Sequence, residues 1–197
     1  MLDNEIFLKI RHFAIENSEN NDIHGFSHVE RVYNNCVKIG QKLNANMKIL
    51  KIAALLHDIG RIDEKTDNLK RNHAEISATK AKEFLATNNF NLSGKEIDNI
   101  IHSIKAHSFS NKILPRTQEA KILSDADKLD AIGAIGIFRT IGFTLQNNGG
   151  IDQVIEHLEN KILKLKEQIF LDYSKKIAEI RHNTVLEFYN KIKKERI

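Results

Sequence analysis

The chain has 197 residues, of which 41% are hydrophobic and 28% charged, a balance typical of a soluble globular protein. No apolar stretch is long enough to span a bilayer, and the N-terminal segment mixes charged with apolar residues, unlike a secretory signal. We therefore expect a cytoplasmic protein without a membrane partner. The net charge of +4 indicates an anionic partner only weakly. Zinc-finger, RNA-binding and phosphate-loop motifs do not accompany it, which disfavours nucleic acid.

The apolar spacing predicts an all-α protein, because no useful window shows the period-two alternation of a strand. The only proline is Pro115, so helices can run for most of the length. A first helix is expected at about residues 3–16. A second is expected to open at Ser27, which has the spacing of a capping box with Glu30.

A third helix is expected from Met47 through Ile59, with Gly60 in the position of a C-terminal cap. Its residues are apolar nearly all round, which is typical of a central, buried helix. Three further helices are expected at about 73–86, 93–107 and 117–133, the second of them opened by a capping box of Ser93 and Glu96.

The last third of the chain carries a coiled-coil-like seam, because apolar residues recur at spacings of three and four over 151–169. The seam either packs on its own domain, which we favour, or forms a homodimer interface. The linker at 146–150 is short and polar, so we do not divide the chain there. We expect one domain over 1–197, with a core at about 20–145 and C-terminal helices at 151–197 packed on it.

The sharpest local feature is His57-Asp58, at the end of the apolar third helix. An ionised aspartate buried there is costly unless it is compensated, and the C-terminal end of a helix dipole disfavours a carboxylate. A cation would resolve both problems. Imidazole with carboxylate suits Mn, Fe, Co or Ni, or Mg where oxygen ligands dominate. Alone, the pair is a weak indication, since a surface His-Asp dipeptide is far commoner than a site.

Two other segments carry the same chemistry. His28 lies in the first turn expected for the second helix. Asp125, Asp127 and Asp130 crowd one short segment, where the last two would be helical neighbours and repel each other. A cation or a nearby base relieves such repulsion. A solvated acidic face is the alternative, although the flanking apolar residues favour partial burial.

The order of these residues resembles the H…HD…D motif of the HD-domain superfamily of metal-dependent phosphohydrolases. Three segments are similar to its first, second and last motifs: 24–32 (HGFSHVERV), 55–60 (LLHDIG) and 126–129 (ADKL). The last of these segments indicates that Asp127, rather than Asp125, is the metal ligand. A narrower match, carried by 125–136, is to the stand-alone bacterial and archaeal HD hydrolases of the YedJ/YpgQ-like group. The resemblance covers the chain from about residue 22 to its end.

The resemblance implies a helical bundle that holds one divalent metal through His28, His57, Asp58 and Asp127. It also implies hydrolysis of phosphate esters or anhydrides. A metal in such a site lowers the pKa of water and offsets charge on phosphate oxygens. Asp58 is the candidate catalytic residue, because it could bind the metal and also orient the attacking water.

Four further residues are candidates for binding the substrate or a second metal ion. By the resemblance, His73 and His107 stand where two-metal HD phosphodiesterases carry extra ligands. They either hold a second metal or donate hydrogen bonds to a phosphate. Arg61 and Lys128 follow the two motif aspartates in the sequence and could meet substrate phosphates.

Two residues near His28 are weaker candidates. His24 would share a helical face with His28 only if the helix began before Ser27, and we interpret it as a substrate or supporting residue. Arg31 is one turn from His28 on the same face, and its alternative role is an ion pair with a local carboxylate.

The sequence departs from the motifs of other branches of the superfamily, which argues against the substrates of those branches. The alarmone hydrolases and some nucleotidases carry an acidic residue three positions after the metal Asp or its His, whereas Ile59, Gly60 and Arg61 follow Asp58 here. The Gly-Tyr-Pro segment of the cyclic-di-GMP type is missing from the sequence. Gly25 stands where relatives often carry Asp, which removes any role of that side chain.

The leading hypothesis is a metal-dependent phosphohydrolase acting on nucleotides or a related small phosphorylated metabolite, with a nucleoside triphosphate (pyro)phosphohydrolase favoured. The first alternative is a two-metal phosphodiesterase that uses His73 and His107. The second is a non-catalytic nucleotide-sensing module. Counting the metal ions bound per chain distinguishes the two-metal phosphodiesterase from the leading hypothesis. A test for hydrolysis of phosphate esters and anhydrides distinguishes the non-catalytic module from both enzymes.

Overall fold

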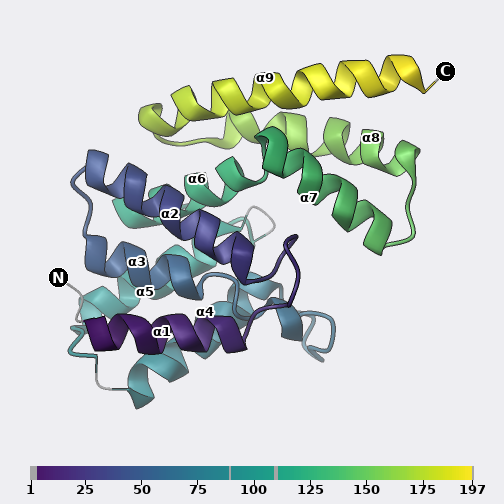
Figure 1. The fold of residues 1–197 in the computed structure, drawn as a ribbon. Coiled ribbons are helices and arrows are strands. Elements are labelled where there is room, and N and C mark those ends of the chain that lie inside the picture. The colour runs from purple at the N-terminus through teal and green to yellow at the C-terminus, as the bar shows by residue number, and fades with distance from the viewer. Residues whose placement is uncertain (1–3, 89, 109–110, 197) are drawn as a thin grey trace. The chain divides into compact units, whose positions relative to one another are not determined.

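The computed structural model describes residues 4–88, 90–108 and 111–196, and within these ranges the regular elements are all helical, as predicted (Figure 1). By their internal contacts the residues form two units, Met1–Ser124 and Asp125–Ile197. The first unit contains α1 (Asn4–Glu16), α2 (Phe26–Lys42), α3 (Met47–Leu56), η1 (Arg61–Asp63), α4 (His73–Thr87) and α5 (Gly94–His107). In the described ranges, no helix combines the length and apolarity needed to cross a membrane.

The helix α3 forms the centre of the first unit, as its apolar sequence predicts. It packs against α1, α2, α4 and α5, and seven of its ten residues are buried. Its last helical residue is Leu56, earlier than expected, and residues 57–60 form turns. The backbone N–H of Gly60 donates to the Ser77 hydroxyl at 2.9 Å instead of continuing the helical ladder. The early end therefore follows from a contact with α4.

The start of α2 differs from the sequence-based expectation. The N-cap is Gly25, not Ser27, and no side chain caps the helix, so the predicted capping box of Ser27 and Glu30 is wrong. The preceding loop is tight, since a Cβ atom at Gly25 would lie 2.1 Å from the carbonyl oxygen of Glu19. The loop therefore determines where the helix begins, and a helix-start signal two residues later is overridden.

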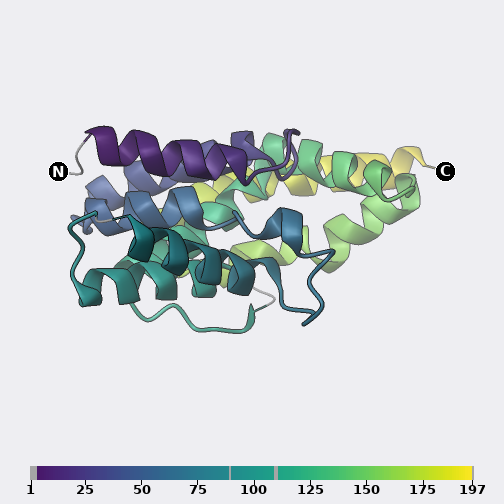
Figure 2. The ribbon, with the colours of Figure 1, turned by 90° about the horizontal axis from the view of Figure 1, so that it is seen from below.

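The helices α4 and α5 pack against one another, and Figure 2 shows them in teal on the lower side of the first unit. The helix α4 is capped by the Asn72 side chain, which accepts from the backbone N–H of Glu75. The helix α5 has the predicted capping box, with both reciprocal bonds between Ser93 and Glu96 present. The single turn η1 contacts α4 and links it to the end of α3.

The helix α6 (Gln118–Asp130) leads into the second unit, where α7 (Gly133–Gln146), α8 (Ile151–Asn160), η3 (Ile162–Gln168) and α9 (Asp172–Glu195) pack on one another. The predicted seam is divided between α8 and η3, because the backbone turns at Lys161. Ile155, Leu158, Ile162 and Leu165 are at most 5% exposed. The apolar residues of the seam are therefore buried within the second unit.

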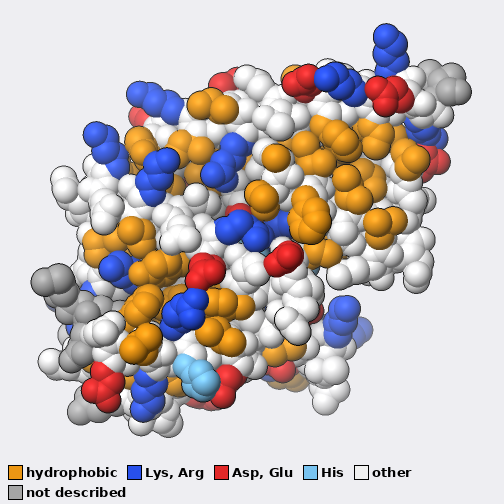
Figure 3. All heavy atoms as spheres, viewed as in Figure 1, with side chains coloured by type: hydrophobic (Ala, Val, Ile, Leu, Met, Phe, Trp, Pro, Cys, Tyr) orange, Lys and Arg blue, Asp and Glu red, His pale blue; other side chains and the backbone are white. Residues whose placement is uncertain are grey.

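Exposed apolar side chains of the second unit include Ile180 on α9 and a group on α7. Ile135, Phe138 and Leu145 are 45%, 54% and 60% exposed. Figure 3 shows apolar side chains gathered over this helix. Among the large apolar side chains of residues 151–169, Ile151 at the start of the seam is exposed, at 57%. A homodimer through this seam stays a prediction.

Candidate metal centre

Four helix ends of the first unit bring the site together. His28 lies near the N-terminus of α2, and His73 is the first residue of α4. His57 caps the C-terminus of α3, and His107 is the last residue of α5. Asp58 follows His57 in the turn. The C-terminal ends of α3 and α5 carry partial negative charge, which favours a cation nearby.

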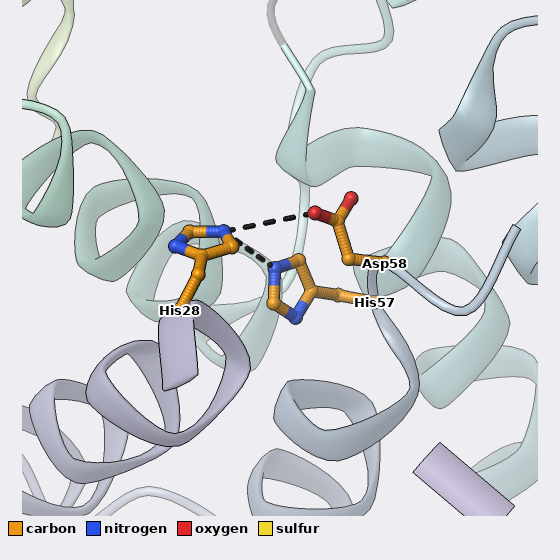
Figure 4. A group of neighbouring side chains, drawn as sticks. All are labelled: His28, His57 and Asp58. Carbon is orange, nitrogen blue, oxygen red and sulfur yellow. Dashed lines mark hydrogen bonds and ion pairs between the residues drawn. The ribbon is translucent and has the colours of Figure 1, made fainter. Parts of the chain in front are cut away.

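His28, His57 and Asp58 form the first group of side chains, drawn in Figure 4. The Nε2 atoms of His28 and His57 are 3.4 Å apart, and His28 Nε2 lies 3.7 Å from Asp58 Oδ2. All three residues are at most 2% exposed. One ligand atom of each lies within 4.8 Å of the others, close enough for one ion to contact all three.

Asp58 also belongs to a second group, with His73 and His107. Its Oδ1 atom lies 3.6 Å from His73 Nε2 and 3.9 Å from His107 Nε2. The two oxygens of one carboxylate therefore face different histidines, Oδ2 toward His28 and Oδ1 toward the second group. Asp58 is shared between the two groups.

The ring orientation of two histidines is set by their positions at helix C-termini. His57 Nδ1 lies 2.8 Å from the carbonyl oxygen of Ala54, and His107 Nδ1 lies 2.6 Å from that of Ile104. Carbonyls in the last turn of a helix have no intrahelical partner and accept such bonds. A carbonyl can only accept, so Nδ1 carries the proton in each ring, and Nε2 of the neutral ring is left with its lone pair. Both rings are thereby prepared as ligands.

Arg61 compensates the buried charge of Asp58. Its Nε donates to Oδ2 at 2.7 Å and its Nη2 to Oδ1 at 3.1 Å, a bidentate pair. Burial alone would raise the pKa of Asp58, but Arg61 and the imidazoles of His57, His73 and His28 hold this pKa well below its ordinary value. The compensation that the sequence predicts for Asp58 is thus supplied in part by a side chain three residues away.

The comparison with known families settles the relationship. Residues 25–132, more than half of the chain, match the HD domain family, and this span contains every residue of the two groups. The chain belongs to the HD domain family.

Known HD proteins resemble this chain over nearly its whole length. The YpgQ protein of Bacillus subtilis is 33% identical over 180 residues, which cover 87% of this chain and 84% of YpgQ. The crystal structure of Bacillus subtilis YpgQ in complex with ADP matches with a TM-score of 0.78 at 31% identity, covering 99% of this chain and 97% of that one. A "predicted HD superfamily hydrolase" from an uncultured Thermotogales bacterium matches with a TM-score of 0.70 at 27% identity, covering 96% and 92%. The YpgQ-like resemblance is confirmed.

Among the other predicted residues of the first unit of this HD protein, Arg61 and His73 contact Asp58 as described. His24 is half-buried, and its backbone N–H donates to the Asn21 side chain. Arg31 donates to the backbone carbonyl of Asp22 at 3.3 Å.

The last HD motif lies in the second unit, and the structure describes its acidic residues there. The Asp125 carboxylate accepts from the backbone N–H groups of Phe170 and Leu171 at 2.8 and 3.0 Å. Asp130 pairs with Arg139 at 2.9 Å. Lys128 is 5% exposed, and burial lowers its pKa. Asp127 as the fourth ligand stays a prediction from the sequence.

Sequence reasoning missed Glu64, which touches His73. Its Oε1 accepts from the backbone N–H of His73 at 2.9 Å and lies 3.3 Å from His73 Nδ1. The sequence shows Glu64 only as an acidic residue displaced from the position where other HD branches carry one. Glu64 lies nine residues before His73 in the sequence, so no local signal could have found this contact.

Proposed function

We propose that this HD protein is a metal-dependent phosphohydrolase that acts on nucleotides. The observation that carries the proposal is the buried pair of His-Asp groups that share Asp58. The HD relative YpgQ forms a complex with ADP, which supports a nucleotide as the ligand here. Nucleoside triphosphates are the favoured substrates, with another small phosphorylated metabolite as the alternative.

The donor set fits a divalent cation. Buried imidazoles whose Nδ1–H groups are bonded to helix carbonyls present Nε2 lone pairs, and the intervening carboxylate is ionised. His28, His57 and Asp58 would hold the ion, and this mixed nitrogen and oxygen set suits Mn, Fe, Co or Ni. When bound, such an ion supplies Lewis acidity toward water and phosphate oxygens.

The chain's own residues orient the reactants. We assign Asp58 a second role, in which one carboxylate oxygen accepts a hydrogen bond from the attacking water. Arg61, one-quarter exposed and next to Asp58, is placed to contact a phosphate oxygen as well. Water adds to phosphorus and the bridging P–O bond breaks, so attack at the α-phosphorus releases pyrophosphate and attack at the γ-phosphorus releases orthophosphate.

Asp127 is proposed as the fourth ligand on the strength of its motif. Asp125, its nearest competitor, already accepts two backbone N–H groups and holds the start of α9 in place. Lys128 next to the motif is retained as a candidate for substrate phosphates, as are His24 and Arg31 in the first unit.

The test is product release from a panel of nucleoside tri-, di- and monophosphates with Mn²⁺ added. We expect the wild type to hydrolyse triphosphates and Asp58→Ala to lose at least about 100-fold in rate, because it removes a ligand and the water's acceptor. His28→Ala is expected to behave similarly. Its matched control is His12→Ala, since His12 is exposed and pairs with Glu16 on the surface of α1. A wild type without hydrolysis of any ester or anhydride would favour the nucleotide-sensing module.

A two-metal phosphodiesterase is the second candidate, and the second group of Asp58, His73 and His107 favours it. Metal analysis of the purified protein separates the candidates. Two equivalents of metal per chain, together with cleavage of bis(p-nitrophenyl) phosphate that His107→Ala removes, would support the diesterase. One equivalent, with triphosphates as the only substrates, would exclude it.

A further inference from the structure

Glu64 connects the turn after the HD motif to the first residue of α4. The single turn η1 follows Asp58, and its C-cap residue Glu64 lies in front of the N-terminus of α4. There the same oxygen, Oε1, faces both the backbone N–H and the ring Nδ1 of His73. The backbone bond satisfies one of the orphan N–H groups of the helix, and the ring contact determines how the imidazole is held.

The ring contact has a consequence for the far side of the imidazole. A carboxylate oxygen can only accept, so Nδ1 carries the proton. In the neutral ring, Nε2 then has a lone pair and cannot donate. This atom lies 3.6 Å from Asp58 Oδ1, another acceptor. Two acceptor atoms cannot form a hydrogen bond with each other, whereas a cation can bind to both. The geometry therefore favours His73 Nε2 as a cation ligand over a hydrogen-bond donor to phosphate.

The electrostatics of Glu64 agree with this geometry. The hydrogen bond from the His73 side chain is the largest cause that lowers the pKa of Glu64, to about 2. Glu64 is therefore ionised at neutral pH. An ionised carboxylate behind an imidazole raises the basicity of the nitrogen on the other side.

We propose that Glu64 is a positioning residue that holds His73 with Nε2 toward Asp58, as a ligand for a divalent cation in the second group. This assignment rests on the proposed metal-dependent function, since it requires a cation beside Asp58, and it adds an ion in the second group to the one assigned to His28, His57 and Asp58. It decides between the two roles left open for His73, in favour of metal binding over hydrogen bonding to phosphate.

The chain offers a matched control in the neighbouring acid. Asp63 is also part of this turn, but its carboxylate accepts from the Lys80 ammonium at 2.6 Å and is half-exposed. Asp63→Asn removes the same charge from almost the same place without touching His73. Glu64→Gln is the conservative variant, because its amide oxygen can still accept from both His73 groups.

The first experiment is ¹⁵N NMR of the histidine ring nitrogens in the metal-free protein, with His73 assigned by its loss in His73→Gln. We expect His73 to carry its proton on Nδ1 in the wild type, in Glu64→Gln and in Asp63→Asn. In Glu64→Ala this preference should disappear. Far-UV circular dichroism checks that α4 remains folded, and an unchanged ring signal in Glu64→Ala would overturn the proposal.

The second experiment is titration with Mn²⁺, followed by electron paramagnetic resonance. Glu64→Ala should weaken Mn²⁺ binding about 10- to 100-fold, as expected for loss of a carboxylate behind a histidine ligand, while Glu64→Gln and Asp63→Asn stay close to wild type. Equal weakening in Asp63→Asn and Glu64→Ala would overturn the proposal. A wild type that binds Mn²⁺ without hydrolysing nucleotides would reject the proposed function alone, and one that binds no Mn²⁺ would reject both.

Discussion

Asp58 is the residue on which the site depends. It is buried, ionised and shared between two pairs of histidines, and Arg61 holds it by a bidentate pair. Removing one partner from a buried charge is strongly destabilising, because the remaining charge is left uncompensated. Each histidine beside Asp58 therefore has two tasks, to stabilise the apo protein and to present a ligand atom, whereas Arg61 has only the first.

At the residue scale, the assignment of Asp127 over Asp125 can be tested by paired substitutions. We expect Asp127→Asn to lose Mn²⁺ binding and hydrolysis, because it removes a ligand. Asp125→Asn should retain the metal but lower the free energy of unfolding by about 1–3 kcal/mol, since its carboxylate accepts two backbone N–H groups. Urea denaturation and metal analysis of both variants check this. Loss of metal in Asp125→Asn alone would reverse the assignment.

The residues that the sequence could identify are those with unusual chemistry in an apolar setting. His57-Asp58 follows an apolar helix, and the family motif then indicates His28. Glu64 could not be found in this way, because an acidic residue in a polar turn is ordinary. Its role depends on the contact between the end of η1 and the N-terminus of α4, nine residues later, which is a property of the fold and not of the local sequence.

At the element scale, the site depends on how closely α4 approaches the turn after α3. A Cβ atom at Gly60 would lie 2.5 Å from the backbone nitrogen of Ser77 and 2.8 Å from the carbonyl oxygen of His73. These are backbone atoms of α4 and cannot move aside independently. The hydrogen bond from Gly60 to Ser77 fixes the same approach. The spacing between Asp58 and His73 is thus set by a glycine.

Gly60→Ala is expected to lower the free energy of unfolding by about 1–3 kcal/mol, because the added methyl forces α4 away from the turn. Gly94→Ala is the control, since a Cβ atom at this first position of α5 meets nothing within 4 Å. That change should raise stability by about 0.4–1 kcal/mol. Urea unfolding of the two variants gives both values, and a neutral Gly60→Ala would contradict the close approach.

Helix identity could be predicted from apolar periodicity, but helix ends could not always be. The capping box at Ser93 was recognised because its partners are local. The expected box at Ser27 failed because the tight loop before Gly25 sets the helix start. The helix α3 ends earlier than expected because the backbone N–H of Gly60 donates to the Ser77 hydroxyl of α4. In both failures a contact outside the helix overrides the local signal.

At the scale of the whole molecule, metal binding and stability are coupled. The candidate ligands of the first unit come from four different helices, so the unfolded chain does not offer the site. A ligand that binds only the native state stabilises it by mass action. Because the contacts divide the chain into two units, the packing of residues 151–197 on the core as one domain stays a prediction.

Mn²⁺ is therefore expected to raise the melting temperature. At a free concentration of about 100 times Kd, the stabilisation is about 2.7 kcal/mol. In a chain of this size each kcal/mol shifts the melting temperature by roughly 2–4 °C. Differential scanning calorimetry with Mn²⁺ and with EDTA measures the shift, and Asp58→Ala should abolish it. An equal shift in Asp58→Ala would mean that the ion binds elsewhere.

The sharing of Asp58 also changes how the chain is connected. Ions bound at both groups would join His28 to His107 through one carboxylate, closing a loop of about 80 residues, and long closed loops restrict a chain the most. In effect the first unit would acquire a removable cross-link. Local opening of α2 or α5 would then require release of an ion, so amide hydrogen exchange at these helix ends would slow when the metal is added and recover when it is chelated.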